Sequence, residues 1–378
     1  MRYNKYSMEY LLGKKIAITF DYVMQYGGAE VILIELLNIF PNASLYTPIL
    51  WKGNIPNDVW AKIIKHRVYV SFLNKFYFMR KVWKFFLPFN AKFFENLDLD
   101  NYDVVISISS GFAKWLNCKS HTKHIAYINT PPRFLWGMQT TTFEKIPRFI
   151  RFLLSFQLNK WRRKDKYYAR QADKIYGNSQ NIVNKIKKFY KTDAYVLYPP
   201  VSIKHMSVSK DIFMNQKDFY LIINRLVAYK QIDKVIEAFN ILGKTLVIIG
   251  DGPEISNLKR IAGEKIFFTG FVDEKIKYSY LASCKALIYP GEEDFGIGMV
   301  ESLLFGKPVI AYKGGGAIEI LDEKSGKFFG SHDPEVIKKT ILSFEEQNYS
   351  STYIKERAEK FSVQKFRDNI GNILKGLF

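Results

Sequence analysis

Two carboxylates at a fixed spacing offer the clearest chemistry in this sequence. Glu293 and Glu301 bracket the stretch 295–298, which holds two glycines, and an apolar helical pattern begins at once. An ionised carboxylate accepts hydrogen bonds well from hydroxyl groups. Glycines at a helix start leave backbone N–H groups open to an anion. The pattern therefore fits a ligand that combines hydroxyls with phosphate. The alternative is that these are ordinary acids near a helix start, where they favour the helix dipole.

Two cations stand next to the predicted start of another helix. Arg225 follows an apolar, strand-like run, and Lys230 stands just before the helical pattern 231–242. Two positive charges several ångströms apart suit a diphosphate. A solvated basic loop is the alternative in so basic a chain. A third motif, Gly27-Gly28, would let a backbone approach a ligand closely, or would simply form a tight strand–helix turn. We interpret the turn "IIGDGPE" (248–254) as structural.

Composition narrows the class of protein. A chain of 378 residues predicts two or three domains, and 48% hydrophobic with 16% aromatic residues excludes disorder. The two cysteines, Cys118 and Cys284, lie far apart, which argues against a disulfide scaffold or zinc site and indicates a reducing compartment. No signal-peptide core and no apolar run of roughly 20 residues is found, so we expect a cytoplasmic protein, at most peripheral to a membrane. The net charge of +20 leaves nucleic acid, anionic lipid and anionic substrates open.

Strand-like and helical patterns alternate along both halves of the chain. This predicts an α/β fold with two Rossmann-like, doubly wound domains. The two prolines in 197–202 mark a linker. We therefore expect an N-terminal domain over 1–197 and a C-terminal domain over 198–355, with a last helix at about 356–378 that is able to pack back onto the first domain. Ligands of such folds bind at the carboxyl ends of the strands, and with two domains we expect them in the cleft between.

With these motifs in order, the sequence resembles the family-4 retaining glycosyltransferases of GT-B architecture. "EEDFGIGMVE" (292–301) looks like the E-x7-E signature of that family, and "RLVAYKQID" (225–233) looks like its Arg/Lys diphosphate motif. One branch, the WbaZ-type O-antigen mannosyltransferases, is resembled more closely, over about residues 14–370. Its marks here are "YGGAEVILIELLNIFPNASLYTPI", "VSFLNKF", "FLPFNAKFFENLDLDNYDVVISISSGFAKW", "HIAYINTPPRFLW", "GNSQNIVNKIKKFY" and "VLYPPV".

The resemblance implies a role for each motif. Glu301 would hold the ribose hydroxyls of a nucleotide, and Glu293 a hydroxyl of the donor sugar. Arg225 and Lys230 would hold the diphosphate, helped by the Gly27-Gly28 turn. Backbone N–H groups would hold sugar hydroxyls and phosphate at Phe295, Gly296, Ile297 and Gly298. The implied donor is GDP-mannose, bound by the C-terminal domain, although no residue distinguishes guanine from uracil. The implied acceptor is a lipid-linked or lipopolysaccharide glycan, bound by the N-terminal domain. No metal or other cofactor is implied, in agreement with the lack of an Asp-x-Asp pair or histidine cluster.

One residue departs from the pattern of the branch. Where the branch usually reads Tyr-x-His-Thr-Pro, this chain has Asn129 in place of the histidine, which family enzymes hold near the donor sugar. Asn129 donates hydrogen bonds but cannot shuttle a proton. Either the histidine acts in positioning and Asn129 replaces it as a catalytic residue, or the enzyme is slow or altered in its donor. His124, five residues earlier, belongs to the branch pattern too, but a simple strand would not bring it to the same place.

Two segments bear on the acceptor. Residues 74–94 and 147–168 interleave basic with bulky aromatic residues, a combination that suits anionic membrane surfaces. We expect a peripheral site on the inner face of the plasma membrane; helices that pack the N-terminal domain are the alternative. A nucleic-acid binder is disfavoured, because no RNP, KH, helix-turn-helix or zinc pattern is present. An inactive glycosyltransferase-like scaffold, a UDP-sugar enzyme, and a GT-B epimerase or sugar-phosphate synthase are the remaining rivals.

Overall fold

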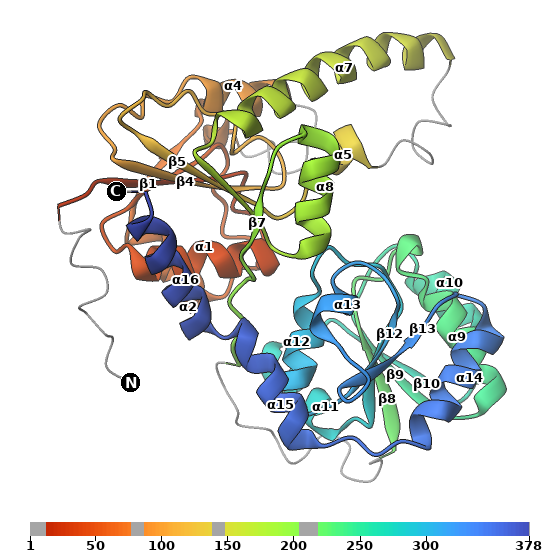
Figure 1. Ribbon diagram of the computed structural model, residues 1–378. Helices are drawn as coiled ribbons and strands as arrows, with labels where there is room; N and C mark the ends of the chain where they lie inside the picture. Colours follow the sequence, from red (N-terminus) through yellow and green to blue (C-terminus); the bar gives the residue numbers. More distant parts are fainter. Residues whose placement is uncertain (1–12, 77–86, 138–147, 204–217, 378) are drawn as a thin grey trace. The chain divides into compact units, whose positions relative to one another are not determined.

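The chain forms two compact units (Figure 1). This computed structural model describes residues 13–76, 87–137, 148–203 and 218–377. Unit 1 comprises residues 1–200 and 363–378, and unit 2 comprises residues 201–362. The changeover at 200/201 lies inside the predicted linker 197–202, and the return to unit 1 begins at Val363 rather than at residue 356.

Unit 1 is built on a parallel sheet of seven strands. Its order is β3-β2-β1-β4-β5-β6-β7. The central strands β1 and β4 are buried at every position, as an α/β sheet covered on both faces requires. The strands are β1 (Ile16–Phe20), β2 (Ser44–Thr47), β3 (Arg67–Val70), β4 (Val104–Ser109), β5 (Lys123–Ile128), β6 (Lys174–Gly177) and β7 (Tyr195–Val196).

Helices cover both faces of this sheet. One face packs with α1 (Gly28–Ile39), α2 (Asn57–Ile64) and α16 (Val363–Lys375). Helix α16 inserts three apolar side chains into this core, and Arg367 pairs with Glu35 of α1. On the other face, and near the strand ends, lie α4 (Leu87–Glu95), α5 (Arg133–Trp136), α7 (Arg148–Gln171), α8 (Gln180–Tyr190) and the 3-10 turn η2 (Phe72–Lys75).

Unit 2 repeats the plan with six parallel strands. Its order is β10-β9-β8-β11-β12-β13. Helices α9, α10 and α14 pack on one face, and α12 lies against β11 and β12. The strands are β8 (Phe219–Ile223), β9 (Thr245–Ile249), β10 (Ile266–Gly270), β11 (Ala286–Tyr289), β12 (Val309–Tyr312) and β13 (Gly326–Phe329). The helices are η4 (Ala228–Lys230), α9 (Ile232–Leu242), α10 (Ile255–Ile261), α11 (Glu274–Ser283), α12 (Ile297–Leu304), α13 (Ala317–Ile320), α14 (Pro334–Glu345), α15 (Ser351–Ala358) and η5 (Glu359–Phe361).

The strand order reverses once in each sheet. The reversal falls between β1 and β4 in unit 1, and between β8 and β11 in unit 2. Neighbouring crossovers leave in opposite directions at these points, so a crevice opens beyond the carboxyl ends of the two strands. The predicted fold class, α/β with two Rossmann-like domains, is confirmed.

A buried polar network ties the loops of unit 1 together. Asp165 of α7 accepts hydrogen bonds from the indoles of Trp115 (2.8 Å) and Trp136 (2.7 Å) and from the Tyr190 hydroxyl (2.8 Å). The Lys114 ammonium lies 2.5 Å from the same carboxylate, and both charged side chains are fully buried. One carboxylate therefore joins the loop after β4 to α5, α7 and α8.

We predict that Asp165→Asn destabilises unit 1 by about 3–5 kcal/mol, because it removes the carboxylate that pairs with the buried Lys114 ammonium. Urea unfolding followed by tryptophan fluorescence measures the loss. Asp193→Asn is the matched control, since its carboxylate is 89% exposed and lies 4.0 Å from Lys187. The control should stay within about 0.5 kcal/mol of the parent protein. A loss below 1 kcal/mol in Asp165→Asn would contradict this account of the network.

Candidate functional site

The predicted motifs of unit 2 gather at the reversal of its sheet. Arg225 stands just beyond the carboxyl end of β8, and Lys230 ends the short η4 turn that follows. Glu293 lies in the loop after the neighbouring strand β11, and Glu301 lies in α12, which follows that loop. The predicted diphosphate-binding cations and the predicted hydroxyl-binding acids thus follow adjacent strands, at the place where such folds bind ligands.

A buried ion pair forms the centre of this site. The Lys230 side chain is almost fully buried, and its ammonium contacts the Glu293 carboxylate. The Tyr289 hydroxyl donates to the same Glu293 oxygen at 3.4 Å, and the ring of Tyr229 lies 5.0 Å from the ammonium. A buried ammonium needs a negative partner, and Glu293 supplies it.

Glu301 is paired in the same way. Lys277 of α11 donates to its carboxylate at 2.8 Å, and the Tyr278 hydroxyl donates at 3.4 Å. Burial first, and then the nearby charge of Glu301, raise the pKa of Tyr289, so Tyr289 stands close to both acids. Lys277 and Tyr278 were missed by the sequence analysis, because nothing in a helical segment 23 or 24 residues before Glu301 signals a tertiary contact.

Arg225 differs from the two lysines. It is exposed, and within the described residues no carboxylate lies in ion-pair range of its guanidinium. Its backbone N–H is held by the side chain of Asn224 at 3.0 Å. The site thus contains one exposed cation, Arg225, and one buried cation, Lys230.

The loop between the two acids is shaped by glycine. Gly296 adopts φ +106° and caps the start of α12, a conformation that L side chains avoid. Phe295 is buried and packs edge to face on Phe361, with ring centroids 5.4 Å apart. Ile297 and Gly298 then open the helix, so their N–H groups lie in its first turn.

Two further glycines hold this loop and the Arg225 loop in place. A Cβ at Gly250 would lie 1.8 Å from the carbonyl oxygen of Asn224, and a Cβ at Gly315 would lie 2.1 Å from that of Glu293. Both residues also have positive φ, +139° and +56°. The turn 248–254, which contains Gly250, therefore acts as a structural support of the loop that carries Arg225.

The remaining predicted residues belong to unit 1. Gly27 is the N-cap of α1 with an extended φ of −161°, and a Cβ there would make only an ordinary 3.5 Å contact with Glu30. Neither conformation nor packing within unit 1 requires glycine at position 27. Glu30 follows in the first turn, where burial raises its pKa to about 7. Gly28 is the first residue of α1 and is exposed.

Asn129 follows β5 directly. Its backbone N–H donates to Ser109 at 2.9 Å, and its side-chain Nδ2 is buried with no hydrogen-bond partner among the described residues. His124, the other candidate in this segment, lies inside the sheet with its Nε2 2.8 Å from the Ser107 hydroxyl, and burial lowers its pKa to about 4. The strand alternation thus keeps His124 in the core, while Asn129 stands at the strand end.

Two general features of the described ranges bear on metal binding and on membranes. In these ranges no group of three or more His, Cys, Asp or Glu side chains is arranged to bind a metal ion. None of the helices there is both long and apolar enough to pass through a bilayer. Residues 77–86 and 138–147, inside or beside the two basic-aromatic segments, lie outside the described residues.

Comparison with known proteins agrees with this geometry. Residues 208–361 match the family "Glycosyl transferases group 1". Unit 2 of this chain is therefore similar to a glycosyltransferase domain.

Relatives extend the similarity. A protein of Methanocaldococcus jannaschii, "Uncharacterized glycosyltransferase MJ1069", is 23% identical over 91% of this chain and 92% of its own length. The "Alpha-1,3/1,6-mannosyltransferase ALG2" of Dictyostelium discoideum is 28% identical over 54% of this chain and 61% of its length. A "GDP-mannose-dependent alpha-(1-6)-phosphatidylinositol dimannoside mannosyltransferase" of Mycobacterium tuberculosis is 34% identical over 37% of this chain and 39% of its length. The matches thus span less than two thirds of these two mannosyltransferases.

Solved structures share the two-unit plan. Anabaena Alr3699/HepE in complex with UDP covers 96% of this chain and 100% of its own, with a TM-score of 0.68 at 17% identity. Sucrose-phosphate synthase from Thermosynechococcus elongatus covers 97% and 99%, with a TM-score of 0.65 at 14% identity. At this identity the likeness establishes the fold.

Proposed function

We propose that this protein is a retaining glycosyltransferase that transfers a mannosyl group from GDP-mannose to a lipid-linked or lipopolysaccharide glycan. The observation that carries the proposal is the Lys230–Glu293 pair at the strand reversal of unit 2. It joins a cation suited to diphosphate and an acid suited to a sugar hydroxyl at one point. The named mannosyltransferases among the relatives support mannose, and the Mycobacterium tuberculosis relative is named for GDP-mannose. WbaZ-type O-antigen specificity is the narrower form of the proposal.

Donor binding in this proposal rearranges ion pairs. The diphosphate takes Lys230 from Glu293, and Arg225 adds a second positive charge. Glu293 is then available to a hydroxyl of the donor sugar, while Glu301 accepts from the ribose hydroxyls next to Lys277 and Tyr278. Backbone N–H groups of Phe295, Gly296, Ile297 and Gly298 complete the cradle for phosphate and sugar.

The reaction then needs little covalent chemistry from the protein. The bond between the sugar C1 and the β-phosphate oxygen breaks, and a bond from C1 to the acceptor oxygen forms on the same face. The acceptor hydroxyl passes its proton to the departing phosphate oxygen. Lys230 and Arg225 stabilise the negative charge that develops there. Because these cations and N–H groups carry that charge, we propose that no metal takes part, and activity that persists in EDTA would support this.

Unit 1 contributes Gly27-Gly28 and Asn129 in this proposal. The exposed Gly28 and the sterically unconstrained Gly27 leave a backbone that a ligand can approach closely. The buried Nδ2 of Asn129, without a partner among the described residues, supplies a hydrogen-bond donor. Asn129 would thus position the donor sugar and move no proton.

A UDP-sugar is the second candidate donor. It is favoured by the fold match to a structure that contains UDP. An inactive scaffold is the candidate that Asn129 raises. A thermal-shift screen separates the two donors, and donor hydrolysis or transfer separates an enzyme from a scaffold.

We predict that GDP-mannose at 100 times its dissociation constant stabilises the protein by about 2.7 kcal/mol, and that UDP-glucose at equal concentration does not. The measurement is thermal unfolding with each nucleotide sugar, together with free mannose as a control. Stabilisation by UDP-glucose alone would show that the donor is a UDP-sugar and not GDP-mannose. If no nucleotide sugar stabilises the protein, the inactive scaffold would be the better explanation.

We predict that Lys230→Ala lowers kcat by roughly 100-fold, because it removes on the order of 3 kcal/mol of charge stabilisation from the leaving diphosphate. Donor turnover with the glycan acceptor measures the effect. Lys234→Ala is the matched control, since Lys234 lies four residues on and, among the described residues, its ion pairs are with acids of its own helix, α9. Turnover within a factor of two in Lys230→Ala would show that Lys230 does not serve the diphosphate.

We further propose that unit 1 docks on the inner face of the plasma membrane, as the basic-aromatic segments 74–94 and 147–168 suggest. Support within the described residues comes from exposed aromatic side chains on β3, in and just after η2, and on α4. These are Tyr69, Phe72, Phe76 and Phe89, which are 44% to 62% exposed.

We predict that the protein sediments with vesicles that contain anionic phospholipid at low salt, and that about 0.5 M salt releases it, because salt screens the attraction between charges. Vesicles of neutral phospholipid are the control. Absence of binding to anionic vesicles at low salt would overturn the docking proposal without touching the transfer reaction.

A further inference from the structure

One residue beside the Lys230–Glu293 pair has an unusual backbone conformation. Gln231 follows Lys230 directly and lies in the left-handed region, with φ 54° and ψ 35°. Among the described residues other than glycine, Lys191 at the end of α8 also has a positive φ. An L side chain in this region is crowded by the backbone, so the conformation persists only where the surrounding structure holds it. Strain of this kind clusters at functional sites.

The left-handed residue joins two elements with different tasks. The η4 turn ends at Lys230, whose side chain is buried against Glu293. Helix α9 begins at Ile232, whose side chain is buried in the core of unit 2. In a continuous helix, residues two positions apart point to nearly opposite sides. The backbone angles of Gln231 therefore set the direction of the Lys230 side chain relative to α9.

The side chain of Gln231 also closes the η4 turn. The carbonyl oxygen of Ala228, the first residue of η4, accepts the backbone N–H of Gln231 at 3.1 Å and its side-chain Nε2 at 3.3 Å. A glycine at position 231 would adopt the same backbone angles without strain, but it would have no amide group to donate. The strained residue thus adds a hydrogen bond across the turn that carries Lys230.

The Lys230 side chain has little room to move. A Cβ at Gly291 would lie 2.7 Å from its Cδ, so the stem of the side chain is tightly packed. Its ammonium is nearly excluded from water and depends on the Glu293 carboxylate for a counter-ion. An opening of the η4 turn would disturb both the packed stem and the ion pair.

We propose that Gln231 is a positioning residue, which holds the η4 turn closed and so keeps the Lys230 ammonium in place for the diphosphate. The use of Lys230 for a diphosphate rests on the proposed function, whereas the hold of Gln231 on Lys230 does not. Electrostatic stabilisation of a leaving group depends on charges that are in place before the reaction begins. Gln231 would therefore act on turnover through Lys230.

Chemical labelling of lysine tests the proposal without any donor. The full chain is treated with acetic anhydride, and mass spectrometry of its peptides follows the acetylation of each lysine with time. We expect Lys230 to react at least threefold faster in Gln231→Gly and in Gln231→Met than in the parent protein, because the turn opens more often without the amide. Gln231→Met keeps the side-chain length and isolates the effect of the hydrogen bond. Lys234 on α9 is the internal reference and should keep its rate.

Lys191→Gly is the matched control, since it relieves the same backbone conformation in unit 1. It should leave the labelling of Lys230 unchanged. The melting temperature of Gln231→Gly should lie within about 3 °C of the parent value, because the relief of strain offsets the added freedom of the unfolded chain. A smaller increase in Lys230 labelling in either Gln231 variant would overturn the proposal. A larger fall in melting temperature would show a structural role instead and would overturn it too.

Turnover links this positioning to the proposed function. In the hydrolysis of GDP-mannose, Gln231→Gly should lower kcat at least tenfold and change the donor KM less than threefold, because a fixed ammonium acts mainly where charge develops. Lys191→Gly should match the parent protein. If Lys230 labelling rises while kcat stays unchanged, Gln231 still positions Lys230. That result would overturn the role of Lys230 in the transfer reaction, and with it the proposed function.

Discussion

A buried ammonium group must have a negative partner, and this requirement organises the candidate site of unit 2. Lys230 is nearly excluded from water, and the Glu293 carboxylate neutralises it. The contact requires the loop after β11 to meet the η4 turn after β8, which is possible because the strand order reverses between these two strands. Gly315 supports the Glu293 loop from behind, and Gly291 allows the Lys230 side chain to pass, since a Cβ there would lie 2.7 Å from its Cδ. The fold of unit 2 thus holds the Lys230–Glu293 pair in place, and under the proposed function a diphosphate would exchange one anion for another.

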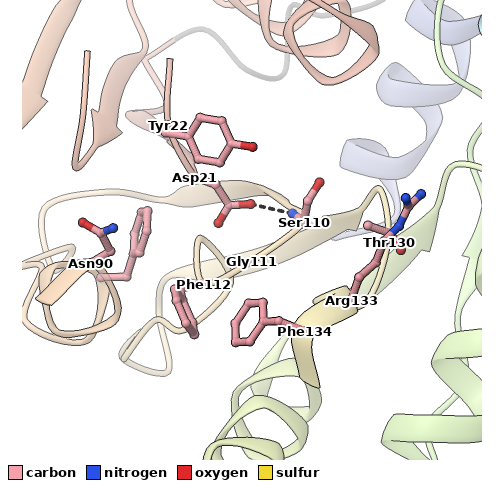
Figure 2. A pocket seen from close by; sticks show the side chains of 10 residues that line it. Asp21, Tyr22, Asn90, Ser110, Gly111, Phe112, Thr130, Arg133 and Phe134 are labelled. Atoms are coloured by element: carbon pink, nitrogen blue, oxygen red, sulfur yellow. Dashed lines mark hydrogen bonds between the residues drawn. The ribbon is translucent and has the colours of Figure 1, made fainter. Parts of the chain in front are cut away.

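The same architecture serves unit 1 with different chemistry. Its pocket also lies at the strand reversal, and it is lined by Asp21, Arg133 and several aromatic rings (Figure 2). The buried Lys114–Asp165 pair supports the unit 1 walls. In both units a fully or nearly buried lysine pairs with a carboxylate close to the strand reversal. These ion pairs hold the loops at the strand ends in place.

Much of this arrangement could be predicted from the sequence, for reasons that are local. Alternating apolar strands and helical patterns imply parallel sheets, and the ends of those strands locate Arg225, Glu293 and Asn129. The contacts that complete the arrangement depend on distant partners and leave no local signal, as for Lys277 with Glu301 and Asp165 with two indoles. The sequence predicts hydroxyl recognition by Glu293 but not its pairing with Lys230. Spacing along the chain does not show which charged side chains meet in the folded protein. The donor and acceptor remain proposals, as do the roles of the residues assigned to them.

The central claim is that Glu293 and a diphosphate compete for Lys230. Calorimetric titration of GDP into the parent protein and into Glu293→Gln tests it most directly, because GDP carries the diphosphate without the sugar. Removing the competing carboxylate leaves the buried ammonium without a counter-ion, so the account predicts tighter GDP binding in Glu293→Gln, by on the order of tenfold or about 1.4 kcal/mol. Equal or weaker GDP binding in a folded Glu293→Gln protein would contradict it.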